Sequence, residues 1–423
     1  MPKPTPDCRA TERKHPWPMA RLGDVCGTIN GIWKGLRKPF VHVGIIRSSN
    51  MTKNCEFSLD KTIYIDVEEK KYKQRKLLAG DIIVERSGGG PGQPVGRAVY
   101  FDLEDGEYSV SNFTSILRVK DANALNGKFL QLYLTSQYFQ GATENIQSNT
   151  TGLHNLDFDA YLNFDVPLPP LSEQKEIVAR LERELAAVEK MKKGFEALSE
   201  TAKAEFKAEL KEVFEELDGK MDGQARSSEQ GHLSWRELGE VCDVRDGTHD
   251  TPAKCDNGYL LLTSKNVRKG KVDKTNAYCI SASDYAAINK RSGVDQWDVL
   301  FSMIGTVGET AIVDEPPDFA IKNMGLFKTH ADELLARWIK YYFDSPVAKQ
   351  LILDRLKGSN QKFLSLGVLR AFPLALTDRD SMLRLVTRID AAKVRAEKLE
   401  AKAREGVAVC ETMRKAILKE AFE

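Results

Sequence analysis

The chain has 423 residues, a formal net charge of +1 and 29% charged residues. This length exceeds one ordinary domain and predicts two or three, each large enough to bury its own core. The near-neutral charge excludes recognition of nucleic acid by overall charge, so such a partner would have to be bound by local basic patches.

The N-terminal segment, residues 1–20, is polar and proline-rich and lacks the apolar stretch of a signal peptide. No run approaches the roughly 18 apolar residues of a membrane-spanning helix. The seven cysteines are scattered without a CxxC pair, which is typical of a reduced protein without structural zinc. We therefore expect a cytoplasmic protein that binds no membrane.

In chain order, residues 1–170 mix short β-rich runs with short helices. Strands are expected in "TIYIDV", "GDIIVE", "RAVYF" and "SILRV", and a helix in "NGKFLQLYLTSQYF". The prolines of "VPLPP", at the end of this segment, force an extended backbone. A long charged helix follows directly, over residues 171–217.

The second half of the chain has the same order of segments. Residues 218–232 form a linker of Gly, Ser and Gln without apolar periodicity. Residues 233–375 form a second globular half, with strands in "GYLLLT", "DVLFSMI" and "TAIV" and a helix in "DELLARWIKYYF". A second long helix, 376–423, ends the sequence.

The two halves are copies of one unit, as a search for internal repeats indicates. "LGDVC" at 22–26 returns as "LGEVC" at 238–242, and "AGDIIV" at 79–84 returns as "QWDVLF" at 296–301. The helical pairs "VARLE" and "VTRID", and "LKEVFE" and "LKEAFE", share one offset along the chain. The two long helices therefore have equal lengths.

Each long helix carries a narrow apolar seam on a charged surface, because its apolar residues fall three or four apart. The seam includes Leu181, Leu185 and Met191 in the first helix and Ile389 and Met413 in the second. Neither seam can be buried alone, so we expect an antiparallel coiled coil. We expect Ser172 and Asp380 to be the N-caps. Two independent helical tails are the alternative.

The expected fold class is α+β, with two pseudo-symmetric globular α/β domains separated by a pair of long antiparallel coiled-coil helices. At this point the sequence resembles the specificity subunits of type I restriction–modification enzymes. "PLPPLSEQKEIVARLE" at 167–182 is similar to that family's signature, and "GDIIVERSGGGPGQPVGRAV" and "GSNQKFLSLGVLRAFPLAL" are similar to its target-recognition domains. The start of the second helix, "FPLALTDRDSMLRLV", departs from the signature because it lacks the Pro-Pro and Glu-Gln pairs.

The resemblance implies a non-catalytic subunit that reads a split sequence of double-stranded DNA, one half-site per recognition domain. It implies docking of two methyltransferase (modification) subunits and of restriction/translocase subunits. It also implies that S-adenosylmethionine, Mg²⁺ and ATP belong to those partners, so this chain needs no cofactor of its own.

Candidate DNA-contacting residues lie in Gly-rich and basic loops. In "SGGGPGQPVG" (87–96) glycines would let backbone amides approach a phosphate; a plain turn is the alternative. The loop "GIWKGLRKPF" (31–40) mixes Trp with Lys and Arg, and "DGTHD" (246–250) and "SKNVRKGKVDK" (264–274) are the candidates of the second half. The predicted DNA-binding residues are Trp33, Lys34, Arg37, Arg86, Ser87, Gly88, Gly89, Arg97, Thr248, His249, Lys265, Asn266 and Arg268.

No catalytic residue and no metal ligand set is predicted. The motif "DEPPDF" (314–319) differs from the Pro-Pro motif of DNA amino-methyltransferases and favours a turn, and "SGGGPGQPVG" lacks the Gly-Lys-Ser/Thr ending of a nucleotide-binding loop. Three rival functions stay open at this point: the specificity module of a related restriction system, a stand-alone DNA methyltransferase or nuclease, and a scaffold that binds protein.

Overall fold

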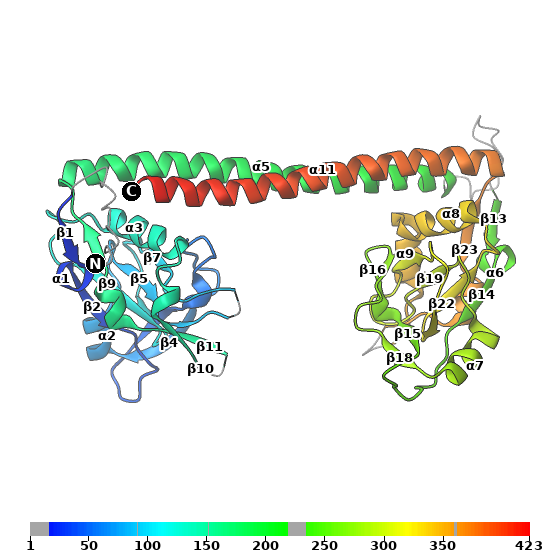
Figure 1. Ribbon diagram of the computed structural model, residues 1–423, viewed down its shortest axis with the longest axis horizontal. Helices are drawn as coiled ribbons and strands as arrows, with labels where there is room; N and C mark the ends of the chain where they lie inside the picture. The colour runs from blue at the N-terminus through cyan, green and yellow to red at the C-terminus, as the bar shows by residue number, and fades with distance from the viewer. Residues whose placement is uncertain (1–16, 91, 151, 219–233, 359–361) are drawn as a thin grey trace, which may run out of the picture. The chain divides into compact units, whose positions relative to one another are not determined.

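The computed structural model describes residues 17–90, 92–150, 152–218, 234–358 and 362–423 (Figure 1). The predicted linker at 218–232 lies outside these residues except for Asp218, and so does Cys8. Contacts divide the described chain into two compact units. Unit 1 runs up to Phe195 and includes Glu405–Glu423, and unit 2 is Glu196–Arg404.

Unit 1 contains a β-rich domain followed by the first part of a long helix. Its strands are β1 Met19–Arg21, β2 Cys26–Asn30, β3 Phe40–Ile46, β4 Ile63–Glu68, β5 Ile82–Glu85, β6 Ser87–Gly88, β7 Ala98–Tyr100, β8 Tyr108–Val110, β9 Thr114–Val119, β10 Gln147–Thr150, β11 Leu153–Leu156 and β12 Asp165–Pro167. Its helices are α1 Leu22–Val25, α2 Glu69–Arg75, α3 Gly127–Phe139 and α4 Phe158–Leu162, with 3₁₀ turns η1 Ser48–Asn50 and η2 Glu144–Ile146.

Unit 2 repeats this plan. Its strands are β13 Ser234–Glu237, β14 Asp243–Asp246, β15 Tyr259–Thr263, β16 Val267–Arg268, β17 Lys271–Val272, β18 Tyr278–Ile280, β19 Val299–Phe301, β20 Thr310–Ile312, β21 Phe319–Lys322, β22 Gly325–Lys328 and β23 Pro373–Leu376. Its helices are α6 Leu238–Val241, α7 Ala282–Ser292, α8 Glu333–Asp344, α9 Pro346–Arg355 and α10 Leu366–Arg370, with the 3₁₀ turn η3 Ser264–Asn266.

The central sheets of the two units have the same strand order. Unit 1 has β2-β9-β5-β7 and unit 2 has β14-β22-β19-β20, all antiparallel. A second sheet in each unit contains one parallel pair, β3 with β8 and β15 with β21. The repeat predicted from "LGDVC" and "LGEVC" is therefore a repeat of structure, since both motifs form the short helix that leads into the first strand of the central sheet.

The proline-rich segment is extended, as its sequence predicts. β12 pairs with β1 through Val166 opposite Ala20, and its counterpart β23 pairs with β13. The helix α5 (Leu171–Asp218) then begins within four residues of β12. Gln174 anchors this turn: its buried amide donates to the carbonyls of Ala124 and Pro169, and its oxygen accepts from the Asn126 backbone amide. The glutamine of the signature therefore joins the start of α5 to the segment before α3.

The second long helix is α11 (Arg379–Glu420), and both units contain a segment of each helix. In unit 1, Lys192 of α5 pairs with Glu411 of α11 at 3.5 Å. In unit 2, Arg388 of α11 pairs with Glu209 and Glu212 of α5. The partner number falls as the α5 number rises, so the helices are antiparallel and the predicted coiled-coil pair is confirmed.

Each unit buries the helix seams against the helix that packs on its sheet. In unit 1, Leu181 and Leu418 share a core with Phe129 of α3. In unit 2, Leu210 and Ile389 are in one core with residues of α8. The repeated ends "LKEVFE" and "LKEAFE" occupy equivalent places: Phe214 packs on Trp338 and Tyr342 of α8, and Phe422 packs on Phe129 and Tyr133 of α3.

Two details of the helix prediction are wrong. Met191 and Met413 are 42% and 39% exposed and therefore lie outside the seam, whose α11 side includes small residues. These buried small residues are Ala392, Ala396, Ala403 and Cys410. The N-caps are also displaced: α5 already begins at Leu171, and Asp378 instead of Asp380 accepts from the Ser381 backbone amide, which lowers the pKa of Asp378.

Among the described residues, no helix is both long and apolar enough to cross a membrane.

Candidate nucleic-acid interface

In unit 1 the predicted contact residues lie at one end of the central sheet. The register places the end of β2 (Asn30), the end of β5 (Glu85) and the start of β9 (Thr114) at the same end of the strands, here called the loop edge. Three loops extend from that edge: residues 31–39, the turn before β9 and the β10–β11 hairpin. The hairpin lies there because β11 pairs with β6, which follows β5. The sheet therefore gathers loops that are far apart in sequence.

The 31–39 loop is fixed by its own backbone. The Gly31 carbonyl accepts from the Arg75 guanidinium at 2.5 Å, and a Cβ on Gly31 would lie 1.9 Å from the Ser111 carbonyl oxygen. The Leu36 backbone amide donates to the Glu68 carboxylate at 3.2 Å. This bond and the pairing with Lys71 lower the pKa of Glu68. Only glycine fits at position 31, so the loop is braced before it meets any ligand.

The side chains of this loop point outward. Trp33 is 67% exposed and Leu36 is 87% exposed, and Lys34 and Arg37 are exposed as well. Burying such an aromatic residue in a core would stabilise the fold, so its exposure on a braced loop favours a binding role.

Arg86 and Ser87 join the same edge. Arg86 donates to the Asn30 side chain at 3.2 Å and lies over the Phe158 ring at 4.5 Å. The Ser87 hydroxyl donates to Asn155 at 2.7 Å. Gly88 and Gly89 have φ of 138° and 67°, which require glycine. Arg86 is partly exposed, and Gly89 is exposed.

Arg97 does not belong to this surface, and its prediction as a DNA contact is corrected. Its side chain is 5% exposed and forms two bonds to Glu85, at 2.7 and 2.8 Å, and one to the Met51 carbonyl. Burial disfavours its charge, but the bonds to Glu85 outweigh this and raise the pKa of Arg97. A phosphate could reach the guanidinium only by breaking the buried pair.

Unit 2 builds the equivalent edge with different side chains. Gly247 takes the place of Gly31: its carbonyl accepts from Arg291 at 3.1 Å, and a Cβ would lie 2.5 Å from the Ile321 carbonyl oxygen. His249 is exposed and lies between Asp246 Oδ2 and Asn323 Oδ1, each at 2.9 Å. The predicted residues Thr248 and His249 therefore lie on a braced loop.

The basic segment 264–274 lies beside this loop, since the Ser264 hydroxyl donates to the Asn323 carbonyl at 2.9 Å. Lys265 and Arg268 are exposed, and the Arg268 guanidinium donates to the Lys265 carbonyl at 2.7 Å. Both can reach a phosphate. These positions are supported by geometry alone and stay predictions.

Asn266 is a second correction. It is 6% exposed, its oxygen accepts from the Thr263 backbone amide, and its amide donates to the Asp273 carbonyl. Asn50 has the same role in unit 1, with Arg47 and Ser58 as partners. The repeated asparagine closes a 3₁₀ turn in each unit, so its amide is not available to read adenine.

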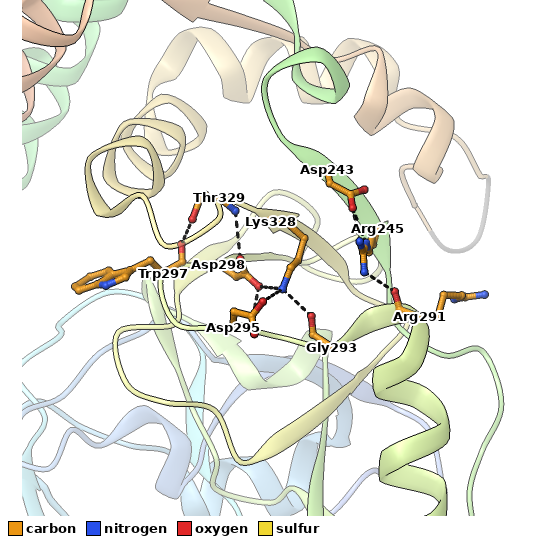
Figure 2. Close-up of polar contacts among 9 residues, drawn as sticks. All are labelled: Asp243, Arg245, Arg291, Gly293, Asp295, Trp297, Asp298, Lys328 and Thr329. Atoms are coloured by element: carbon orange, nitrogen blue, oxygen red, sulfur yellow. Dashed lines mark hydrogen bonds and ion pairs between the residues drawn. The ribbon is translucent and has the colours of Figure 1, made fainter.

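In each unit an ion pair lies at the end of the central sheet opposite to the loop edge. In unit 2 the Lys328 ammonium donates to Asp298 at 2.7 Å, to Asp295 and to the Gly293 carbonyl, while Arg245 donates to the Arg291 carbonyl at 3.1 Å (Figure 2). Burial raises the pKa of Asp298, against the opposing bonds from Lys328 and backbone amides. In unit 1, Arg118 donates two bonds to Asp81 in the equivalent place, both 2.7 Å.

Sequence reasoning missed several residues of these edges. Arg75 and Arg291 brace the two glycines, and Phe113 and Asn323 stand at equivalent positions before β9 and β22. The repeat was the available signal, because aligning "LGDVC" with "LGEVC" also aligns Gly31 with Gly247. Within the described residues no group of three or more His, Cys, Asp or Glu side chains is placed to hold a metal ion.

Comparison with known proteins points to one family. Residues 14–194 match the family model described as the type I restriction modification DNA specificity domain. The chain is 22% identical over 396 residues to the type I restriction enzyme EcoKI specificity subunit of Escherichia coli K12, covering 90% of this chain and 82% of that protein. It is 25% identical over 256 residues to the MjaVIII specificity subunit of Methanocaldococcus jannaschii, covering 57% of this chain and 58% of that protein.

Solved structures share the fold. A structure that concerns complex assembly and conformational transition of a type I restriction–modification system matches with a TM-score of 0.71 and 19% identity, covering 96% of this chain and 97% of that chain. The HsdS subunit from Thermoanaerobacter tengcongensis matches with a TM-score of 0.54 and 18% identity, covering 97% and 98%. The chain thus matches the type I restriction modification DNA specificity domain over residues 14–194 and, over most of its length, is similar to type I restriction–modification specificity subunits.

Proposed function

We propose that the chain reads a bipartite sequence in double-stranded DNA, with one half-site contacted by each unit. One observation carries this proposal. The two units repeat the same braced loop edge, with Gly31 and Gly247 at its base, but present different exposed side chains on it. A support that both units share, under exposed side chains that differ between them, is what two readers of different short sequences require.

The DNA-contacting surface that we propose consists of the predicted residues that remain accessible to solvent in the structure. Lys34, Arg37, Lys265 and Arg268 would neutralise phosphates, while Trp33 and His249 stand where base edges would be contacted. Arg86 to Gly89 and Thr248 would contribute from the neighbouring turns. Lys and Arg on loop tips give affinity that falls with salt, so a chain with a net charge of +1 can still bind DNA through these local patches.

The long helices are the proposed docking site for two methyltransferase subunits and for restriction/translocase subunits. α5 and α11 bury one side in the seam and keep a charged side exposed along their lengths. Because each unit pairs the start of one helix with the end of the other, the same surface occurs twice. A duplicated surface fits two copies of one partner.

We further propose that the chain performs no chemistry and works in the cytoplasm. Catalysis, with S-adenosylmethionine, Mg²⁺ and ATP, would belong to the partner subunits. A stand-alone methyltransferase is the rival reading. Isothermal calorimetry of the purified chain with S-adenosylmethionine separates them: the proposal expects no binding, and micromolar affinity of this chain alone would contradict it.

The direct test of DNA reading is reconstitution. The chain is combined with the methyltransferase subunit of its own system, and genomic DNA from a methylation-deficient host is treated and mapped at base resolution. The expected product is methylation at two short motifs separated by an unread spacer. Fluorescence anisotropy with DNA of that sequence should then give tighter binding than with scrambled DNA. Equal binding of both DNAs would show that this chain does not confer sequence specificity.

A further inference from the structure

The loop edges of the two units hold equivalent pairs of partly or largely exposed side chains with opposite chemistry. Strand register relates β2–β9 to β14–β22: Asn30 lies opposite Ser115, and Asp246 lies opposite Gly325. Phe113 lies two residues before Ser115 in unit 1, and Asn323 lies two residues before Gly325 in unit 2. Two residues beyond Gly31 and Gly247 stand Trp33 and His249.

In unit 1 both tip residues are aromatic and open to solvent. Trp33 is 67% exposed and Phe113 is 51% exposed. The Phe113 carbonyl accepts from the backbone amides of Arg86 and Ser87, at 2.8 and 3.1 Å, so the turn beneath the ring is fixed. Two exposed rings thus lie on fixed turns at the same end of the sheet, and the loop of Trp33 also carries the exposed cations Lys34 and Arg37.

In unit 2 both tip residues are polar and bonded to each other. His249 Nδ1 lies 2.9 Å from Asn323 Oδ1, and Asp246 lies at the other ring nitrogen. The Asn323 backbone is fixed at both ends, since its amide donates to the Thr248 carbonyl at 3.1 Å and its carbonyl accepts from Ser264. This tip is polar where unit 1 has rings, and the exposed His249 would exchange its contacts with Asp246 or Asn323 for contacts with a base.

Base pairs present two kinds of feature in the major groove. The thymine C5-methyl group is apolar, and the amino, carbonyl and ring-nitrogen edges form hydrogen bonds. Aromatic and other apolar side chains suit the methyl group, and amide and imidazole side chains suit the polar edges. Burying one methyl-sized group is worth about 0.8 kcal/mol, which corresponds to about a four-fold change in affinity.

We propose that Trp33 with Phe113 and His249 with Asn323 are equivalent specificity-determining pairs, the first recognising thymine methyl groups in one half-site and the second recognising polar base edges in the other. This inference rests on the proposed reading of bipartite DNA. It adds which residues read each half-site and by what kind of contact. The DNA backbone is then positioned, without selection of sequence, by Lys34, Arg37, Lys265 and Arg268.

The test uses DNA in which uracil replaces thymine, because uracil lacks only the C5-methyl group. Binding of the full chain to its mapped target is measured by fluorescence anisotropy, with uracil placed in one half-site at a time. Substitution in the half-site of unit 1 should weaken binding about three- to ten-fold, and substitution in the other half-site should change it less than two-fold. The double variant W33H/F113N should lose the uracil effect.

Matched variants assign the half-sites. Leu78 is 47% exposed and lies before β5, at the opposite end from the loop edge, so L78N is an apolar-to-polar control in the same unit. L78N should keep the parent uracil effect. H249A/N323A should relax methylation at one or more positions of the other half-site and leave the uracil effect unchanged. All variants should melt within a few degrees of the parent, because the substituted side chains are partly or largely exposed.

Several outcomes overturn this inference while leaving the proposed function intact. In the first, the parent binds its target but uracil has no effect in either half-site. In the second, the half-site read by unit 1 contains no thymine. In the third, W33H/F113N keeps the sequence preference of the parent. Loss of methyltransferase assembly by W33H/F113N with unchanged DNA affinity would assign these rings to a protein contact instead. A parent chain that confers no sequence preference at all would contradict the proposed function itself.

Discussion

Lys328 and Asp298 show how single residues hold the central sheet of unit 2 at the end opposite to the candidate interface. Their side chains are 7% and 0% exposed, and Lys328 has three oxygen partners. A buried pair of this kind adds little net stability relative to an apolar pair, because both charges lose water. It is nevertheless costly to break, since the remaining charge stays buried without its partner.

We expect K328M to destabilise the chain by about 3–5 kcal/mol, because Asp298 loses its counter-charge. D298N/K328M should recover more than half of that loss, since the asparagine can still accept from the Asp295 backbone amide. Urea unfolding followed by circular dichroism measures both. Equal destabilisation by the single and double variants would show that the charge pair is not the source of the effect.

The exposed cations should behave as phosphate contacts. K34A, R37A, K265A and R268A should each weaken binding to all DNA sequences about equally and reduce the slope of log affinity against log salt by about one. N266A is a control, because this buried amide should affect folding and leave the salt slope unchanged. Anisotropy titrations over a range of salt concentrations check this. Four unchanged slopes would place the DNA surface elsewhere.

At the scale of elements, the long helices depend on a seam that only part of their apolar residues form. Leu181 is fully buried and packs with the end of α11, whereas Met191 is 42% exposed on the same helix. L181D should cost several kcal/mol, about 3–5, because a charge would be buried without a partner. M191D should be nearly neutral. Thermal melting and co-purification with the methyltransferase subunit measure the result, and an L181D variant that melts and assembles like the parent would contradict the seam.

The start of α11 is held by an ion pair that titrates. Asp332 caps α8, and two bonds from Arg379 lower the pKa of Asp332 below its ordinary value of 3.8. A lowered pKa in the fold contributes stability above pH 3.8 that is lost as the pH falls through the folded-state value.

D332N keeps an N-cap but loses the charge, so it should be less stable than the parent at pH 7, by about 0.2–1 kcal/mol for a pair in which Arg379 is exposed and Asp332 partly exposed. The difference should vanish near pH 2. Urea midpoints at both pH values test this, and a difference that persists at pH 2 would assign the effect to the cap.

At the scale of the whole molecule, the sequence predicts the architecture well and the site less well. The repeat, the extended proline segment and the apolar seams are local patterns, so they predict fold class and the antiparallel pair. The predicted equal length of the helices is wrong, since α5 has 48 residues and α11 has 42. Arg97 and Asn266 look like surface-loop residues, and only tertiary packing against Glu85 and Thr263 buries them. Phe113 and Asn323 carry no motif, and strand register alone brings them beside the predicted loops.

The central claim is that each unit reads its own half-site, and a chimera tests it most directly. Residues 233–375 are replaced by the second recognition domain of another specificity subunit, and the chimera is combined with the methyltransferase subunit. Methylated positions are then mapped at base resolution in host DNA. The account predicts that one half of the bipartite target changes and that the other half stays as in the parent. Changes in both halves, or in neither, would contradict it.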